Sequence, residues 1–130
     1  MNFSVKPDPA ETISMTGIFS HFHSLQTAIQ FAEESHKATG QNLANVNTPN
    51  YKTKEVPFDQ LLARLSQDPG MENRQSFSVE PTSGLQERKD GNNVDLDREL
   101  AMLKKNSLAF QTLAQLLGSK MGILQKAISS

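Results

Sequence analysis

Apolar residues recur at alternating steps of four and three along the first third of the chain. This N-terminal stripe consists of Ile18, Phe22, Leu25, Ile29, Ala32, His36, Thr39, Leu43 and Val46. Such heptad spacing keeps one side of a helix facing a partner helix, so it predicts a helix over 14–46. Asn45 and Asn47 tolerate the left-handed conformation common at helix C-termini, and Pro49 disfavours helix at the residue before it. The first helix is therefore expected to stop near residue 46.

The same spacing returns in the last third of the chain and predicts a second helix over 93–129. Its first C-terminal stripe is Leu96, Leu100, Leu103, Ser107, Phe110, Ala114, Leu117, Met121, Leu124 and Ile128. A second C-terminal stripe, Met102, Ala109, Leu113, Leu116, Ile123 and Ala127, runs beside it. Together they are too wide for one partner helix. The pattern fits an ordinary three-helix core, and equally a helix that packs on its N-terminal partner and on neighbouring subunits.

The middle segment, 47–92, is predicted to be irregular. Residues 48–51 read as a type II turn, with proline at the second position and asparagine at the third. Residues 58–65 predict two turns of helix, and the alternation over 76–80 suits one short strand. Residues 81–92 hold little apolar material, so we expect a loop that is mobile in the free protein. The fold class is thus mainly α: one domain, 1–130, with its two terminal helices paired as a coiled-coil-like hairpin.

Composition narrows the functional classes. Apolar residues make up 36% of 130, and tryptophan is absent, which predicts a thin core. The net charge of −1 gives no general attraction for nucleic acid or an anionic membrane, and no apolar run is long enough for direct membrane insertion. Without cysteine there are no disulfides or thiolate metal sites. The N-terminus has Lys6 and early prolines but no apolar core segment, so no cleavable signal peptide is expected.

Catalytic constellations are absent from the sequence. His21 and His23 are two residues apart and would point to different sides of a helix, so they cannot share a metal as an i, i+4 pair can. His36 lies in the N-terminal stripe and is expected to be partly buried and hydrogen-bonded. The acidic cluster Asp95, Asp97 and Glu99 is best explained by the start of a helix, because negative carboxylates interact favourably with the N-terminal end of the helix dipole. We therefore expect no enzyme, no cofactor and no metal.

The stretch that closes the first helix is similar to the N-terminal signature of bacterial flagellar axial proteins, the rod, hook and related subunits. It reads Asn42-Leu43-Ala44-Asn45-Val46-Asn47-Thr48-Pro49-Asn50-Tyr51-Lys52. A C-terminal block narrows the resemblance to the family of basal-body rod protein B, the proximal rod subunits. This block reads Asp90-Gly91-Asn92-Asn93-Val94-Asp95-Leu96-Asp97-Arg98-Glu99, followed by Asn106-Ser107-Leu108-Ala109-Phe110-Gln111 and Leu117-Gly118-Ser119-Lys120. The family usually carries glycine where this chain has Asn50, and asparagine is the residue that best replaces glycine at positive φ.

The resemblance implies a structural subunit of the flagellar basal-body rod, used in motility. It implies terminal helices that lie along the rod axis, type III export, and a tube that transmits torque and lines the export channel. Implied partners are other copies, other rod proteins, the membrane-ring adaptor protein and the export gate, in the periplasmic part of the basal body. The motif residues expected to set the turn are Asn42, Leu43, Ala44, Asn45, Asn47, Thr48, Pro49, Asn50 and Tyr51. The expected assembly residues are Ile18, Phe22, Leu25, Ile29, Leu43, Leu96, Leu100, Leu103, Phe110, Leu113, Leu116, Leu117, Met121, Leu124 and Ile128.

The mechanism expected from these patterns is assembly by open-ended helix packing. The stripes that alternate by four and three would pair the two helices of one subunit, and the wide C-terminal surface would pack on neighbours. Terminal helices that expose such surfaces are expected to be partly disordered before assembly. Two rival hypotheses are a cytoplasmic adaptor that forms a closed coiled-coil dimer, and a small hydrolase or metal protein that uses His21, His23 or the acidic cluster.

Overall fold

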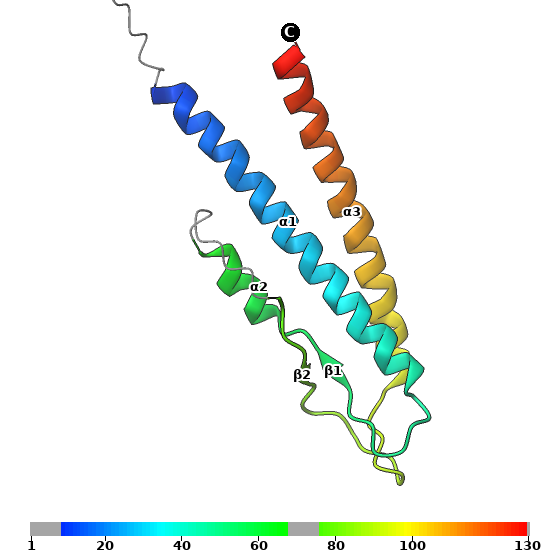
Figure 1. Ribbon diagram of the computed structural model, residues 1–130. Coiled ribbons are helices and arrows are strands. Elements are labelled where there is room, and N and C mark those ends of the chain that lie inside the picture. Colours follow the sequence, from blue (N-terminus) through cyan, green and yellow to red (C-terminus); the bar gives the residue numbers. More distant parts are fainter. Residues whose placement is uncertain (1–8, 68–75, 130) are drawn as a thin grey trace, which may run out of the picture.

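Two long antiparallel helices form a hairpin, and the middle of the chain packs against one side of it (Figure 1). The computed structural model describes residues 9–67 and 76–129, with side chains from residue 17 onward. Helix α1 spans Pro9–Ala44 and helix α3 spans Leu96–Ser129. The two helices lie closest near the turn end of the hairpin and spread apart toward the two ends of the chain (Figure 1). The mainly α hairpin predicted from the stripes is confirmed.

Both long helices differ from their predicted bounds at their N-terminal ends. Helix α1 begins at Pro9 rather than at residue 14. Proline is well tolerated in the first turn of a helix, where its missing N–H has no acceptor to reach, so the early proline is compatible with an early start. Helix α3 begins at Leu96 because Asp95 caps it: the Asp95 carboxylate accepts a 3.2 Å hydrogen bond from the Arg98 backbone N–H.

The stripe that α1 buries is offset from the predicted one. Ala32 and Thr39 are buried as expected, but Ser35 is buried between them and His36 is exposed. The expectation of a partly buried, hydrogen-bonded His36 is therefore wrong. Small side chains such as Ser35 let another helix come close. The buried Thr39 hydroxyl needs no partner from that helix, because it donates a 3.0 Å hydrogen bond to the Ser35 carbonyl oxygen. A count of large apolar residues cannot detect such a stripe.

Helix α3 shows the same offset. Its buried residues within the described ranges are polar, Glu99 and Asn106. Most of the first C-terminal stripe is exposed, namely Leu96, Ser107, Leu100, Phe110, Ala114, Met121 and Ile128, while Leu103, Leu117 and Leu124 are half-buried. The prediction that this stripe pairs the two helices of one subunit is therefore wrong for most of its length. The pairing face lies between the two C-terminal stripes, because buried polar partners on α1 select it.

The middle of the chain supplies a small apolar core beside α1. Helix α2 spans Phe58–Leu65, as predicted. Its Leu61 packs with Val56 and Phe77, and the Phe31 ring of α1 meets the Phe77 ring edge-on at 5.4 Å between centroids. The Arg64 guanidinium lies 3.9 Å from the Phe77 ring centroid, a cation–π contact. These contacts fix α2 on one side of the hairpin.

Two very short strands complete the fold. Strand β1, Lys54–Glu55, pairs antiparallel with strand β2, Glu80–Pro81, so that Lys54 faces Pro81 and Glu55 faces Glu80. The strand predicted over 76–80 is therefore shorter and later than expected. Apart from Glu80, residues 76–80 are irregular, and Gln60 holds this segment through its hydrogen bonds with Ser78. A two-residue strand carries too little alternation for a sequence pattern to reveal it.

The core is thin, as the composition predicts. In the described part of the chain the buried apolar residues are Ala32, Ala38, Val56, Leu61, Phe77 and Val94, and buried polar residues outnumber them. No helix within 9–67 and 76–129 is both long and apolar enough to cross a membrane. Polar contacts must therefore carry much of the specificity of this fold, and they concentrate at one place.

Candidate assembly site at the corner between the terminal helices

The corner is the region where residues 42–55 and 88–99 meet, at the closed end of the hairpin (Figure 1). Helix α1 ends at Ala44, and the turn at 48–51 follows it. The Tyr51 N–H donates 3.3 Å to the Thr48 carbonyl oxygen, and Asn50 has a φ of 62°. Both features belong to a type II turn, so the predicted turn is present, with asparagine in the position that favours glycine.

Asn42 is at the centre of the corner and is 1% exposed. Its amide nitrogen donates to the Lys54 carbonyl oxygen at 2.8 Å and to the Glu99 carboxylate at 3.1 Å. Its amide oxygen accepts from the Tyr51 hydroxyl at 2.9 Å and from the Lys54 N–H at 3.0 Å. An asparagine side chain offers two donors and two acceptor sites, so all four are used. One side chain therefore ties the end of α1 to the turn, to β1 and to α3.

Asn92 belongs to the segment 88–99 and binds the chain that follows α1. Its side-chain amide donates to the carbonyl oxygens of Asn45, Val46 and Thr48 at 2.9, 3.2 and 2.8 Å. These three carbonyls belong to residues that follow the end of α1 at Ala44, so the amide holds the chain where it leaves the helix. The Asn92 amide oxygen accepts from the Val94 N–H at 2.8 Å. A residue close in sequence to α3 thus fixes the turn that follows α1.

Gly91 lies against the type II turn. Its φ is 83°, and a Cβ at this position would lie 2.3 Å from the Asn50 side-chain oxygen. The Asn50 N–H donates 2.9 Å to the Asp90 carbonyl oxygen, and the Lys52 ammonium donates to the Gly91 carbonyl oxygen. Both the positive φ and the close approach require glycine here.

Glu99 carries the one buried carboxylate within the described residues, at 1% exposure. Besides Asn42 it contacts Arg98, whose guanidinium donates 2.9 Å to Glu99 and 3.0 Å to Glu55. Burial raises the pKa of Tyr51 above its ordinary value of 10.0, and the negative charge of Glu99 adds to that rise. A buried charge is tolerated only where it is paired and hydrogen-bonded, and here the partners are Asn42 of α1 and Arg98 of α3, with Glu55 of β1 pairing with Arg98 in turn.

The segment 81–92 is anchored to this corner rather than free of it. The Thr82 N–H donates 2.9 Å to the Thr53 carbonyl oxygen, and the Arg88 guanidinium donates to the Val46 carbonyl oxygen. The Asn93 side chain accepts 2.7 Å from the Thr53 N–H. Residues 82–92 form a loop, as predicted, in which polar side chains and backbone groups replace the apolar contacts that the sequence lacks. Its mobility in the free protein stays a prediction.

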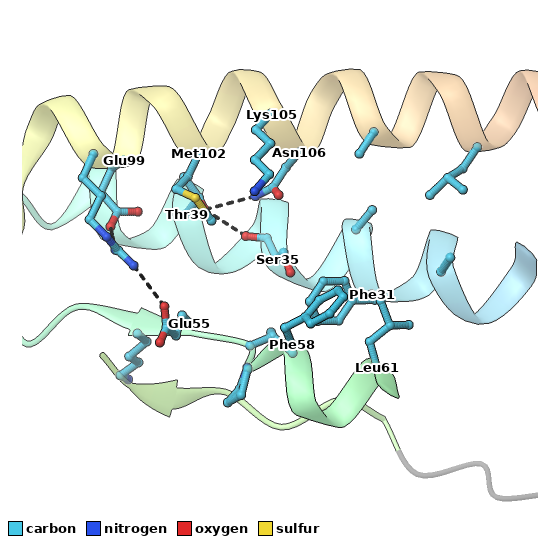
Figure 2. Close-up of a pocket in the computed structure, with 18 residues that line it drawn as sticks. Phe31, Ser35, Thr39, Glu55, Phe58, Leu61, Glu99, Met102, Lys105 and Asn106 are labelled. Atoms are coloured by element: carbon cyan, nitrogen blue, oxygen red, sulfur yellow. Dashed lines mark hydrogen bonds and ion pairs between the residues drawn. The ribbon is translucent and has the colours of Figure 1, made fainter. Parts of the chain in front are cut away.

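A groove opens next to the corner on the side of α2 (Figure 2). This α2-side groove has a volume of about 510 Å³ and runs between α1, α3 and the β1–α2 segment. Small residues of α1, Ala28, Ala32, Ser35 and Thr39, form one wall. Helix α3 forms another with Met102, Lys105, Ala109 and Leu113, and Phe58 and Leu61 of α2 close it. The groove is largely apolar and charged at the corner end.

The chain is similar to flagellar basal body rod proteins named FlgB from several bacteria. It is 32% identical to that of Aquifex aeolicus over 107 residues, which cover 77% of this chain and 86% of the relative. It is 27% identical to that of Bacillus subtilis over 117 residues, covering 82% and 91%. For Escherichia coli the identity is 29% over 123 residues, covering 76% and 86%. No family model matches the chain.

The chain belongs to the FlgB family of flagellar basal body rod proteins. The resemblance found in the sequence is thereby confirmed, and so is the expectation that the chain is a structural protein and not an enzyme. Membership in this family excludes the alternative hypothesis that the chain is a small hydrolase. His21 and His23 are exposed, and no three histidine, aspartate or glutamate side chains in the described ranges gather closely enough to hold a metal.

The FlgB-type motif residues have different environments. Asn42 is buried in the corner, Leu43, Asn45 and Tyr51 are half-buried, and Ala44, Asn47, Thr48, Pro49 and Asn50 are exposed. The corner also depends on four residues that sequence reasoning did not single out as site residues: Asn92, Asn93, Arg98 and Glu99. The signal was present in the C-terminal block quoted above. Glu99 was expected only to favour the start of a helix through its negative charge, whereas its buried side chain accepts a hydrogen bond from Asn42.

Of the fifteen expected assembly residues, seven are exposed and eight are half-buried. Ile18 is exposed, and Phe22, Leu25 and Ile29 are half-buried. On α3 the exposed ones are Leu96, Leu100, Phe110, Leu116, Met121 and Ile128. Their role in assembly stays a prediction. Residues 1–8, on which the expectation about a signal peptide rests, lie outside the described residues.

Proposed function

We propose that this FlgB-family chain is a subunit of the proximal rod that assembles by helix packing into a tube. The observation that carries the proposal is the long unpaired apolar surface on α3, from Leu96 to Ile128. A monomer that needed no partner would bury such a surface or replace it with polar residues. The surface runs along the helix axis, which suits a subunit whose helices lie side by side with those of its neighbours.

In this proposal the corner sets the angle between the two helices, and the helices make the contacts between subunits. The polar bonds of Asn42 and Asn92 are directional, so they hold one geometry more strictly than apolar packing would. A rod that transmits torque needs such a fixed geometry. The assembled tube lines the export channel and connects the membrane ring and export gate to the distal rod.

The proposed partners are other copies, other rod proteins, the membrane-ring adaptor protein and the type III export gate. The proposed location is the periplasmic part of the basal body, which the chain reaches through the type III apparatus. A chain with no cysteine suits this route, because no disulfide has to form or be avoided in an oxidising compartment.

The test is to isolate hook–basal bodies from the source bacterium and to search for this chain by mass spectrometry and immunogold labelling. The expected result is label at the inner-membrane end of the rod. Its absence from basal bodies, with a stable dimer of constant stoichiometry in the cytoplasm, would instead support the closed coiled-coil adaptor.

A further inference from the structure

The α2-side groove has the shape of a site for a helix. Its α1 wall extends from Ala28 to Thr39, twelve residues separated by eleven steps, or roughly 16 Å at 1.5 Å per residue. Four of its five lining residues are alanine, serine or threonine, so the wall is shallow in side chains everywhere except at Phe31. An apolar groove of three helical turns accepts large side chains spaced at i, i+4 and i+7 from an amphipathic helix.

The chain itself carries such a row of side chains on the first half of α3. This α3 ridge consists of Leu96, Leu100, Leu103 and Phe110, at i, i+4, i+7 and i+14. Leu96 is 49% exposed, Leu100 43% and Phe110 41%, although all are large and apolar. The ridge covers fifteen residues in fourteen steps, roughly 21 Å, and so exceeds the α1 wall by about one helical turn. None of its residues lines the groove of its own subunit.

Charge also matches between the two surfaces. Lys105 lies on the groove wall, is exposed, and has no ion-pair partner among the residues that the structure describes. Arg98, the neighbouring groove cation, is already paired with Glu55 and Glu99. Asp97 lies beside the ridge, exposed and likewise without a partner in the described ranges. A ridge seated in the groove of another copy can place Asp97 next to Lys105.

The ridge and the groove lie on different sides of one subunit. Leu100 and Lys105 are five residues apart, so they point roughly 140° away from one another on a helix of 3.6 residues per turn. A contact between two different surfaces leaves a free ridge at one end and a free groove at the other. Such head-to-tail contacts extend an assembly instead of closing a dimer.

We propose that the α2-side groove of one copy receives the α3 ridge of a second copy. This inference rests on the proposed function, because it names the contact between rod subunits. It assigns the groove to a second copy of this chain rather than to a small molecule or a different rod protein.

The absence of cysteine from the chain makes disulfide crosslinking a clean test. The double variant Asp97→Cys/Lys105→Cys would replace the wild-type gene, and isolated basal bodies would be oxidised and run on a non-reducing gel. An internal disulfide is excluded, since residues eight apart on one helix are roughly 12 Å apart, beyond the Cα–Cα reach of the bond. The matched control is Asp97→Cys/Lys104→Cys, because Lys104 is an exposed neighbour that does not line the groove.

The expected result is dimers and higher multimers of this chain in the test variant and their loss in the control and in both single variants. Monomer alone in basal bodies that contain the test variant would overturn the inference and leave the proposed rod function intact. A crosslink to a different rod protein would overturn the second copy as occupant. Absence of the wild-type chain from basal bodies would overturn the proposed function, and this inference with it.

Discussion

Asn42 and Glu99 are 57 residues apart in the chain and share a 3.1 Å hydrogen bond between their buried side chains. Asn42 comes from the last turns of α1 and Glu99 from the first turn of α3. A hydrogen bond to a charged group contributes about 1.5–3 kcal/mol, and leaving the charge unpaired is worse than never burying it. The two ends of the chain therefore recognise one another through polar chemistry at the corner.

Replacing Asn42 with alanine should destabilise the fold strongly. The substitution removes four hydrogen bonds at once, takes the amide donor away from one oxygen of the buried Glu99 carboxylate, and leaves the Tyr51 hydroxyl without its acceptor, while Arg98 still pairs with the other Glu99 oxygen. We expect a loss of roughly 3 kcal/mol in the free energy of unfolding, measured by urea denaturation with an unchanged m-value. The matched control is Asn47→Ala, an exposed motif asparagine, which should change stability by less than about 0.5 kcal/mol. Equal effects at the two positions would contradict this account of the corner.

Gly91 and Asn50 should be energetically coupled. Gly91→Ala forces a Cβ to within 2.3 Å of the Asn50 side chain and places alanine at a φ of 83°. The φ alone should cost about 1–2 kcal/mol, and the overlap adds to it. In the Asn50→Gly background the overlap disappears and only the φ term remains. A double-mutant cycle should therefore show a smaller loss for Gly91→Ala in that background. Strictly additive changes in stability for the two substitutions would show that the contact between the added Cβ and the Asn50 side chain is relieved in another way.

The limits of sequence reasoning are visible at Ser35 and Glu99. Periodicity found both long helices and α2, because large apolar residues mark them. It placed the buried stripe of α1 through His36 instead of Ser35, since a small serine carries no apolar signal. It interpreted Glu99 as a carboxylate that favours the start of a helix, because no neighbouring residue reveals a hydrogen-bond partner 57 positions away, at Asn42. The turn at Asn50 was predictable, since its chemistry lies within four consecutive residues. Long-range polar pairs, in contrast, are invisible to any local pattern.

The titration of Tyr51 should report on the corner. The chain has one tyrosine and no tryptophan, so tyrosinate absorbance follows this side chain alone. Its pKa should lie above 10.0 because of burial first and the Glu99 charge second. The unfolded chain then loses the proton before the folded one does, so stability is fully present below pH 10 and falls as pH rises through the folded pKa.

Two variants separate the causes of that shift. Tyr51→Phe should remove this component of the alkaline loss in stability, although it also removes the hydrogen bond to Asn42. Glu99→Gln should lower the pKa of Tyr51 only in part, because burial remains. A Tyr51 pKa at or below 10.0 in the wild-type protein would show that the hydroxyl is not held in the corner in solution.

Hydrogen exchange in a dilute monomer should show a gradient along both long helices. Amides of residues 30–44 and 96–109 lie near the corner and the α2 core, so they should be the most protected. Farther from the corner, Phe19, Met121, Ile123 and Ile128 are exposed. A helix without packing is marginal in water, so residues 17–25 and 114–128 should open locally and exchange fast. The same amides should become protected in isolated basal bodies, where neighbours cover them. Uniform strong protection along both helices of the dilute monomer would show that the open ends need no partner.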